Sequence, residues 1–168
     1  LTAGLTSLMS AVLVSSQQTL DVFRFWQAGS LSGRGWDVIA AVVPFLAAGA
    51  LITLCAGRAL NGLSLGDDLA RGLGQRVGLS RGITALGVVL LCGAATAAAG
   101  PIGFVGLVIP HMVRSFTGPD YRWILPFSLV LAPVLLIIAD IIGRLALPPG
   151  EIPVGVMTAV IGAPVFIW

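Results

Sequence analysis

The sequence predicts an all-α fold, a bundle of several membrane-spanning helices, and three observations support this. Hydrophobic residues make up 57% of the 168 residues and charged residues only 10%, whereas soluble domains carry about a quarter charged residues. The mean hydropathy is +1.03. The nine basic and seven acidic residues lie in clusters between long apolar runs. So few charges cannot cover a soluble surface, so we expect a bilayer as the solvent.

The apolar runs divide the first half of the chain by length, because a helix needs about 20 apolar residues to cross a bilayer. Residues 2–16 are predicted to be the later part of a helix, and the chain is expected to be a fragment of a longer one. A polar, aromatic and glycine-rich connection is predicted over 17–37. Residues 38–57 then form a spanning helix, and 58–81 form the most polar stretch of the chain.

Gly100 and Pro101 interrupt the next apolar run, residues 83–113. A single helix over this run would be about 46 Å long, against a hydrocarbon core of about 30 Å. Two helices folded back on each other are therefore predicted. The last predicted elements are a span over 123–142, a connection over 143–153 and a helix from residue 154 onwards.

The distribution of arginine predicts the orientation. All nine basic residues are Arg, so the chain has no Walker A lysine, and any ATP hydrolysis must occur on another chain. With two helices in 83–113, six Arg lie on one side of the membrane and three on the other. The excess of basic residues places the 58–81 loop in the cytoplasm. A net charge of +2, scattered among apolar runs, excludes a nucleic-acid surface.

The segment LSLGDDLARGLG, residues 63–74, is the most informative part of this loop. Gly66 can end one turn, and either Asp67 or Asp68 can cap the next helix, which Gly74 terminates. A short apolar stripe is predicted on that helix, formed by Leu69, Ala70 and Leu73. Because the helix is too short to span, two interpretations remain: it lies on the membrane surface, or a cytoplasmic partner grips it.

A second polar motif, ADIIGR, places Asp140 and Arg144 four residues apart with the acid first, the favourable order for an intrahelical ion pair. An Arg that snorkels from a helix end is the other structural interpretation. His111, the only histidine, has no Cys or carboxylate at ligand spacing, so no metal site is predicted. Cys55 and Cys92 lie inside apolar runs and are predicted to be small core residues.

Five ordered segments closely resemble the permease subunits of iron-siderophore, haem and cobalamin ABC importers, and they cover almost the whole chain: ALNGLSLGDDLARGLG, GPIGFVGLVIPHMVR, GPDYRWILP, ADIIGR and EIPVGVMTAVIGAPVFIW. The resemblance implies the second half of a ten-helix ABC importer permease in a bacterial cytoplasmic membrane. It further implies an identical or homologous second permease subunit, cytoplasmic ATP-binding subunits and an extracytoplasmic substrate-binding protein. No cofactor is implied.

The resemblance also implies site residues within this single permease domain, residues 1–168. It makes 58–81 a cytoplasmic coupling loop, and it makes Arg144 a docking residue that pairs with a Glu of the binding protein on the outer face. The coupling residues that match the motif are Gly66, Asp67, Asp68, Ala70, Arg71 and Gly74. The expected activity is ferric siderophore import. The alternatives are a haem or cobalamin permease, or a secondary transporter or channel subunit.

Overall fold

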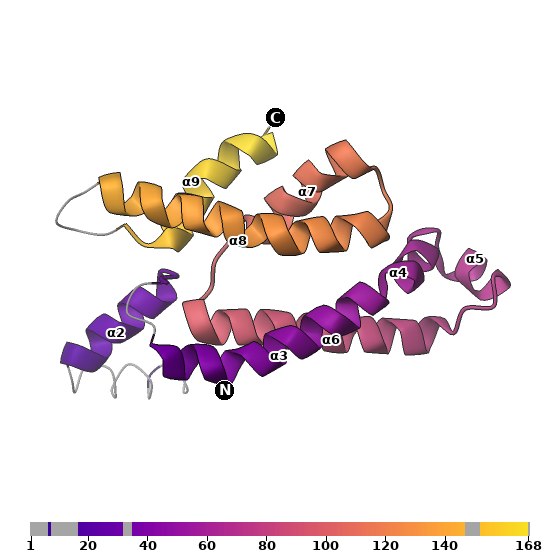
Figure 1. Ribbon diagram of the computed structural model, residues 1–168, viewed down its shortest axis with the longest axis horizontal. Helices are drawn as coiled ribbons and strands as arrows, with labels where there is room; N and C mark the ends of the chain where they lie inside the picture. The colour runs from indigo at the N-terminus through magenta and orange to yellow at the C-terminus, as the bar shows by residue number, and fades with distance from the viewer. Residues whose placement is uncertain (1–6, 8–16, 32–34, 147–151, 168) are drawn as a thin grey trace.

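The computed structural model describes residues 7, 17–31, 35–146 and 152–167, and in these ranges every regular element is a helix (Figure 1). The helices are α2 (Gln17–Gln27), α3 (Trp36–Cys55), α4 (Gly57–Ser64), α5 (Asp67–Gly72), α6 (Val77–Ala99), α7 (Val105–Thr117), α8 (Tyr121–Ala146) and α9 (Val154–Ile167). The all-α prediction is therefore confirmed for the described residues. The helix predicted over 2–16 lies outside them, apart from Ser7.

Three of the described helices, α3, α6 and α8, are long and apolar enough to cross a membrane. Only 11% of the apolar window in each is buried, so most of their apolar side chains face outward. An aqueous solvent would make such surfaces costly, whereas lipid tails or neighbouring transmembrane helices would not. The structure thus supports the bilayer as the solvent of this chain.

Helices α3 and α6 pack side by side through two facing glycines. A β-carbon added at Gly49 would lie 3.1 Å from the carbonyl oxygen of Gly87, and one added at Gly87 would lie 2.8 Å from the Thr53 side chain. The missing side chains allow the two backbones to approach closely, as small residues do in membrane helix pairs. The Thr53 hydroxyl donates to the Gly49 carbonyl at 2.9 Å, so its polar group is satisfied within α3.

The apolar run over 83–113 forms two helices, as predicted, but α7 packs on α8 and α9 and does not fold back on α6 (Figure 1). The chain reverses between α6 and α7, where Gly100 has φ +78° and Phe104 has φ +65°. Both angles lie in the left-handed region, which only glycine adopts at no steric cost. Helix α7 then packs on α8 through a small core of Ile109, Val113 and Ile124.

Three chain segments meet at this reversal. The Ser30 N–H donates to the carbonyl of Ala99 at the end of α6, at 3.0 Å, and the Gly155 N–H near the start of α9 donates to the Gly29 carbonyl at 2.9 Å. Gly29, Ser30 and Gly100 are buried. These backbone hydrogen bonds tie the ends of α2 and α6 to the start of α9.

The predicted connection over 17–37 was wrong in part, because it contains helix α2. Its half-buried apolar side chains Leu20, Phe23 and Trp26 are three residues apart, and the rings of Phe23 and Trp26 stack with centroids 6.1 Å apart. This spacing is typical of an amphipathic helix. Helix α2 was not predicted because the segment as a whole is polar.

Two predicted spans were also too short at their ends, and the span predicted over 38–57 begins and ends two residues later than α3. Helix α6 begins at Val77, six residues before the apolar run, and α8 extends beyond 123–142 at both ends. Hydropathy detects the part of a helix within the bilayer, whereas polar residues continue the same helix into water. Cys55 and Cys92 are both exposed, so their assignment to the core was wrong.

We predict that Gly100→Ala destabilises the protein, because its new β-carbon would clash with the Trp26 carbonyl oxygen at a residue with positive φ. Strain of this kind costs about 1–3 kcal/mol, which should lower the apparent melting temperature of the purified full-length protein by several degrees. Gly103→Ala is the matched control, because its β-carbon would meet no atom within 4 Å. Equal melting temperatures for the two variants would contradict the proposed packing at the reversal.

Candidate functional site

Helices α4 and α5 form the polar end of the molecule, where α3 ends and α6 begins (Figure 1). Gly66 has φ +98° and turns the chain between them. Helix α5 starts at Asp67, and neither Asp67 nor Asp68 caps it, since Gly66 occupies the N-cap position without a side-chain hydrogen bond. The predicted aspartate cap was therefore wrong. Both carboxylates instead lie in the first turn, where a helix N-terminus favours negative charge.

The side chains of α5 divide between two faces. Ala70 is completely buried, whereas Leu65, Leu69 and Leu73 are 58%, 62% and 72% exposed. The apolar stripe predicted from Leu69, Ala70 and Leu73 is thus split, because Ala70 points inward. Leu65 lies just before α5, Leu69 within it and Leu73 just after it, and we call these three exposed leucines the leucine face. They give this polar end an exposed apolar surface outside the apolar spans.

One ion pair fastens α5 to α6, and two more lie within α5. Asp67 accepts from Arg81 at 2.7 Å, and Arg71 lies 4.0 Å from Asp67 and 3.4 Å from Asp68. All of these groups are at least one-third exposed, and an exposed pair stabilises a protein by only about 0–1 kcal/mol. Their main effect is to orient α5. The predicted coupling residues Gly66, Asp67, Asp68, Ala70, Arg71 and Gly74 do lie together in one compact segment.

Gln75 connects the end of this segment to α4. Its Nε2 atom donates to the Ala59 carbonyl at 2.9 Å and to the Ser80 hydroxyl oxygen at 3.3 Å. Beside it is an open hollow of about 570 Å³ between α4, the 73–76 turn and the start of α6. Arg58, Asn61 and Leu65 are among its lining residues. Residues 57–81 therefore form a folded unit rather than an extended loop.

Asn61 links this unit to α8. Its Nδ2 atom donates to Asp120 Oδ1 at 2.5 Å, and its own Oδ1 accepts from the Tyr121 backbone N–H at 2.8 Å. Asp120 Oδ1 also accepts from the Arg122 N–H at 2.9 Å. Asp120 thus occupies the N-cap position of α8, and Asn61 completes that cap from a different helix.

The hydrogen bond from Asn61, followed by that from the Arg122 N–H, lowers the pKa of Asp120 below its usual range. The carboxylate is therefore charged at neutral pH, and its hydrogen bonds persist until the pH falls through that lowered value. Sequence analysis missed both residues. An Asp before an apolar run is a recognisable N-cap signal, but nothing local identifies Asn61, which lies 59 residues away.

The other predicted site lies at the opposite end of α8. The Arg144 Nε donates to Asp140 Oδ2 at 2.8 Å in the last turns of the helix, and Arg144 is 48% exposed. The predicted intrahelical ion pair is therefore present. Since α8 runs from the α4–α5 end of the bundle to its far end, Asp120 and Arg144 lie at opposite ends (Figure 1).

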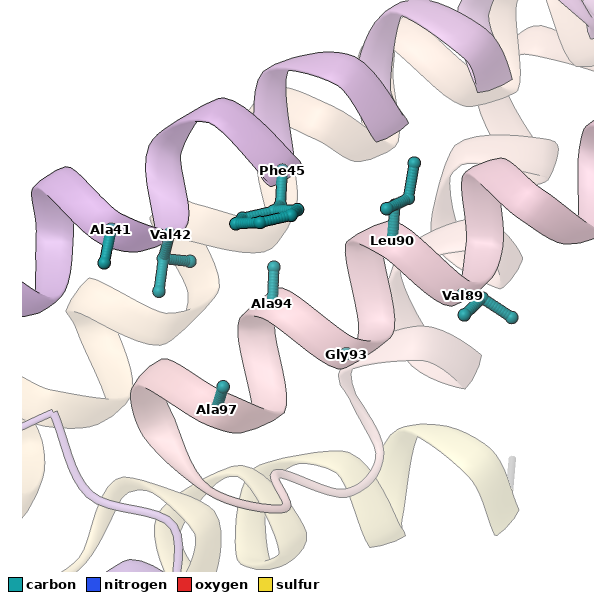
Figure 2. A pocket seen from close by; sticks show the side chains of 8 residues that line it. All are labelled: Ala41, Val42, Phe45, Val89, Leu90, Gly93, Ala94 and Ala97. Carbon is teal, nitrogen blue, oxygen red and sulfur yellow. The ribbon is translucent and has the colours of Figure 1, made fainter.

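A shallow apolar hollow of about 320 Å³ lies between α3 and α6 (Figure 2). Its lining side chains are Ala41, Val42, Phe45, Val89, Leu90, Gly93, Ala94 and Ala97. No side chain among them is polar, so the hollow offers no group for chemistry. Elsewhere in the described part of the chain, no three His, Cys, Asp or Glu side chains lie close enough together to hold a metal ion.

The sequence matches a family model described as the FecCD transport family over residues 1–168. A Bacillus subtilis protein named as a probable siderophore transport system permease, YfiZ, is 46% identical over 99% of this chain and 50% of its own length. The Escherichia coli ferric enterobactin transport system permease FepD is 48% identical over 100% of this chain and 50% of its own length.

A solved structure has the same fold. It is described as an inward-facing conformation of a transporter assigned to the metal-chelate type of ABC transporter. The TM-score is 0.82 at 30% sequence identity, over 96% of this chain and 53% of the other. The chain thus spans about half the length of the curated relatives it matches.

Proposed function

Because this chain belongs to the FecCD transport family, we propose that it forms the second half of a membrane permease that imports ferric siderophores with energy from ATP hydrolysis. The permease binds no nucleotide and catalyses no bond chemistry. Hydrolysis takes place on a separate cytoplasmic subunit, and a substrate-binding protein delivers the chelate from the other side. The observation that carries the proposal is the family match over the whole chain, with its two polar sites at opposite ends of α8.

The ATPase contacts the segment from Gly66 to Gly74. This segment has what a protein contact needs: an exposed apolar centre, the leucine face, with charges from Asp68 and Arg71 beside it. Asp67 fastens it to α6 through Arg81. A folded segment held in this way moves as one body when the ATPase subunits close, and the attached helices move with it.

The binding protein docks at the far end of α8, on Arg144. The guanidinium carries five N–H donors, so Arg144 can keep its bond to Asp140 and still bind an acidic side chain of a partner. Charge complementarity of this kind steers two proteins into register and speeds their encounter. Asp140 orients the arginine before docking.

The chelate crosses by alternating access, in which the helices between the two ends repack so that the pathway opens first to one side and then to the other. The preference for a ferric siderophore follows the names of the relatives, YfiZ and FepD. Selection among chelates is left to the binding protein. A pathway with few charged side chains binds the chelate weakly, so the chelate can leave it readily.

The proposal requires that uptake depend on ATP hydrolysis by the partner. With the full-length permease reconstituted in liposomes, uptake of radioactive ferric siderophore should fall to background when the Walker A lysine of the ATPase is replaced. The same vesicles with the intact ATPase provide the control. Uptake that persists with the inactive ATPase would support a secondary transporter or channel instead.

The contact with the ATPase and the contact with the binding protein should be lost independently when a charge is changed at one of them. Leu69→Glu puts a charge into the apolar centre of the ATPase contact, and Arg144→Glu repels an acidic docking partner. Each change should weaken its own interaction about tenfold, the effect of about 1.4 kcal/mol. Pull-down of the ATPase and titration with the binding protein measure the two affinities.

Each variant serves as the control for the other, because both side chains are exposed and lie at different ends of the bundle. Leu69→Glu should leave docking unchanged, and Arg144→Glu should leave ATPase association unchanged. Normal docking by Arg144→Glu would remove this arginine from the docking surface. Normal association by Leu69→Glu would remove the leucine face from the ATPase contact.

A further inference from the structure

We propose that Asn61 and Asp120 are positioning residues that lock the coupling segment to the start of α8, so that displacement of α5 reaches the far end of that helix. This inference rests on the function proposed above. It assigns a transport role to two residues outside the 63–74 motif and outside the docking end. We call their contact the α4–α8 latch.

In the latch, the single side chain of Asn61 joins α4 to the start of α8. Asn61 uses both halves of its carboxamide, donating to the Asp120 carboxylate and accepting from the Tyr121 N–H. The first turn of an isolated helix has unpaired N–H groups, and here α4 supplies the partner for one of them. Helix α8 therefore begins on α4, and the two cannot separate without breaking the cap.

Backbone packing places the latch beside a second close contact. A β-carbon added at Gly57 would lie 3.6 Å from the Arg122 Cα, so the start of α4 touches the first turn of α8. Gly57 and Asn61 are four residues apart and lie on the same face of α4. Two points of contact one turn apart prevent α4 from pivoting on α8.

The latch is less exposed than the Asp67–Arg81 contact on the other side of the segment. Asp67 and Arg81 form an exposed ion pair, which is worth little in water. The Asn61 bond to Asp120 is partly buried and has a charged acceptor, and hydrogen bonds to charged groups are the stronger kind. Motion of α5 therefore has a route through α4 to α8, in addition to its direct connection to α6.

Helix α8 carries that motion to the docking end. It is continuous through Pro126 and Pro133 from Tyr121 to Ala146, 26 residues, or about 39 Å. Its last turns hold Asp140 and Arg144. One helix thus connects the cap that α4 completes with the arginine assigned to the binding protein, which gives a direct path between the two partners.

The test exchanges the two side chains. Asn61→Asp sets two carboxylates against each other at neutral pH, whereas combining it with Asp120→Asn restores one amide and one carboxylate in reversed positions. In liposomes holding the full-length permease, ATPase and binding protein, the single variant should raise the ATP hydrolysed per chelate imported several-fold. The double variant should return this ratio close to normal.

The ratio of ATP to chelate separates a positioning role from simple loss of fold, because a smaller amount of folded protein lowers both quantities together. Ser115→Ala, an exposed site on α7 outside the latch, should leave the ratio unchanged. An unchanged ratio in Asn61→Asp would overturn the proposal. So would failure of the double variant to restore it.

Limited trypsin digestion provides a readout that does not need transport. Cleavage at the arginines of residues 57–81 in open membrane vesicles should accelerate about tenfold in Asn61→Asp, as expected when a hydrogen bond to a charged group is lost. The double variant should again restore protection. If wild-type uptake proves independent of ATP, the proposed function fails. Digestion then still decides the latch, because equal cleavage rates would overturn it.

Discussion

A bilayer has no water to hydrogen-bond to backbone N–H and C=O groups, so each of these groups must find its partner within the protein. Helices α3, α6 and α8 meet this constraint through their internal hydrogen bonds, apart from the interruptions at Pro44, Pro126 and Pro133. At the end of α6, the Ala99 carbonyl meets it by accepting from the Ser30 N–H. Polar side chains are consequently rare along the spans and concentrated at the ends, which is where the molecule can meet its partners.

The features that depend on local sequence were predictable. Gly100 and Pro101 marked the reversal between α6 and α7, because a helix cannot pass them unbroken and the run was too long for one span. The spacing of four residues between Asp140 and Arg144 predicted their ion pair. Both depend only on neighbours along the chain.

The features that depend on distant contacts were not predictable. The burial of Ala70 and the exposure of Leu69 follow from how α5 is packed on α4 and α6, and the local pattern of small and large residues does not specify it. Asn61 finds Asp120 across 59 residues of sequence. Helix α2 was missed for another reason, since its three apolar residues are diluted by polar ones between them.

These observations together describe a chain with two polar ends joined by α8. At one end, α4 and α5 expose leucines and charges, and at the other Asp140 orients Arg144. Between them, the apolar faces of α3 and α6 suit lipid or further transmembrane helices. The permease proposed above needs this division, because energy would enter on one side of the membrane and cargo on the other.

The opposite placement of these two ends is the central claim, and cysteine labelling tests it most directly. In the full-length permease, with Cys55 and Cys92 replaced, single cysteines at Asp68 and Arg144 are treated with a membrane-impermeant maleimide in intact cells and in inside-out vesicles. The account predicts labelling of Asp68→Cys only from the cytoplasm and of Arg144→Cys only from outside. Labelling of both positions from the same side would contradict it.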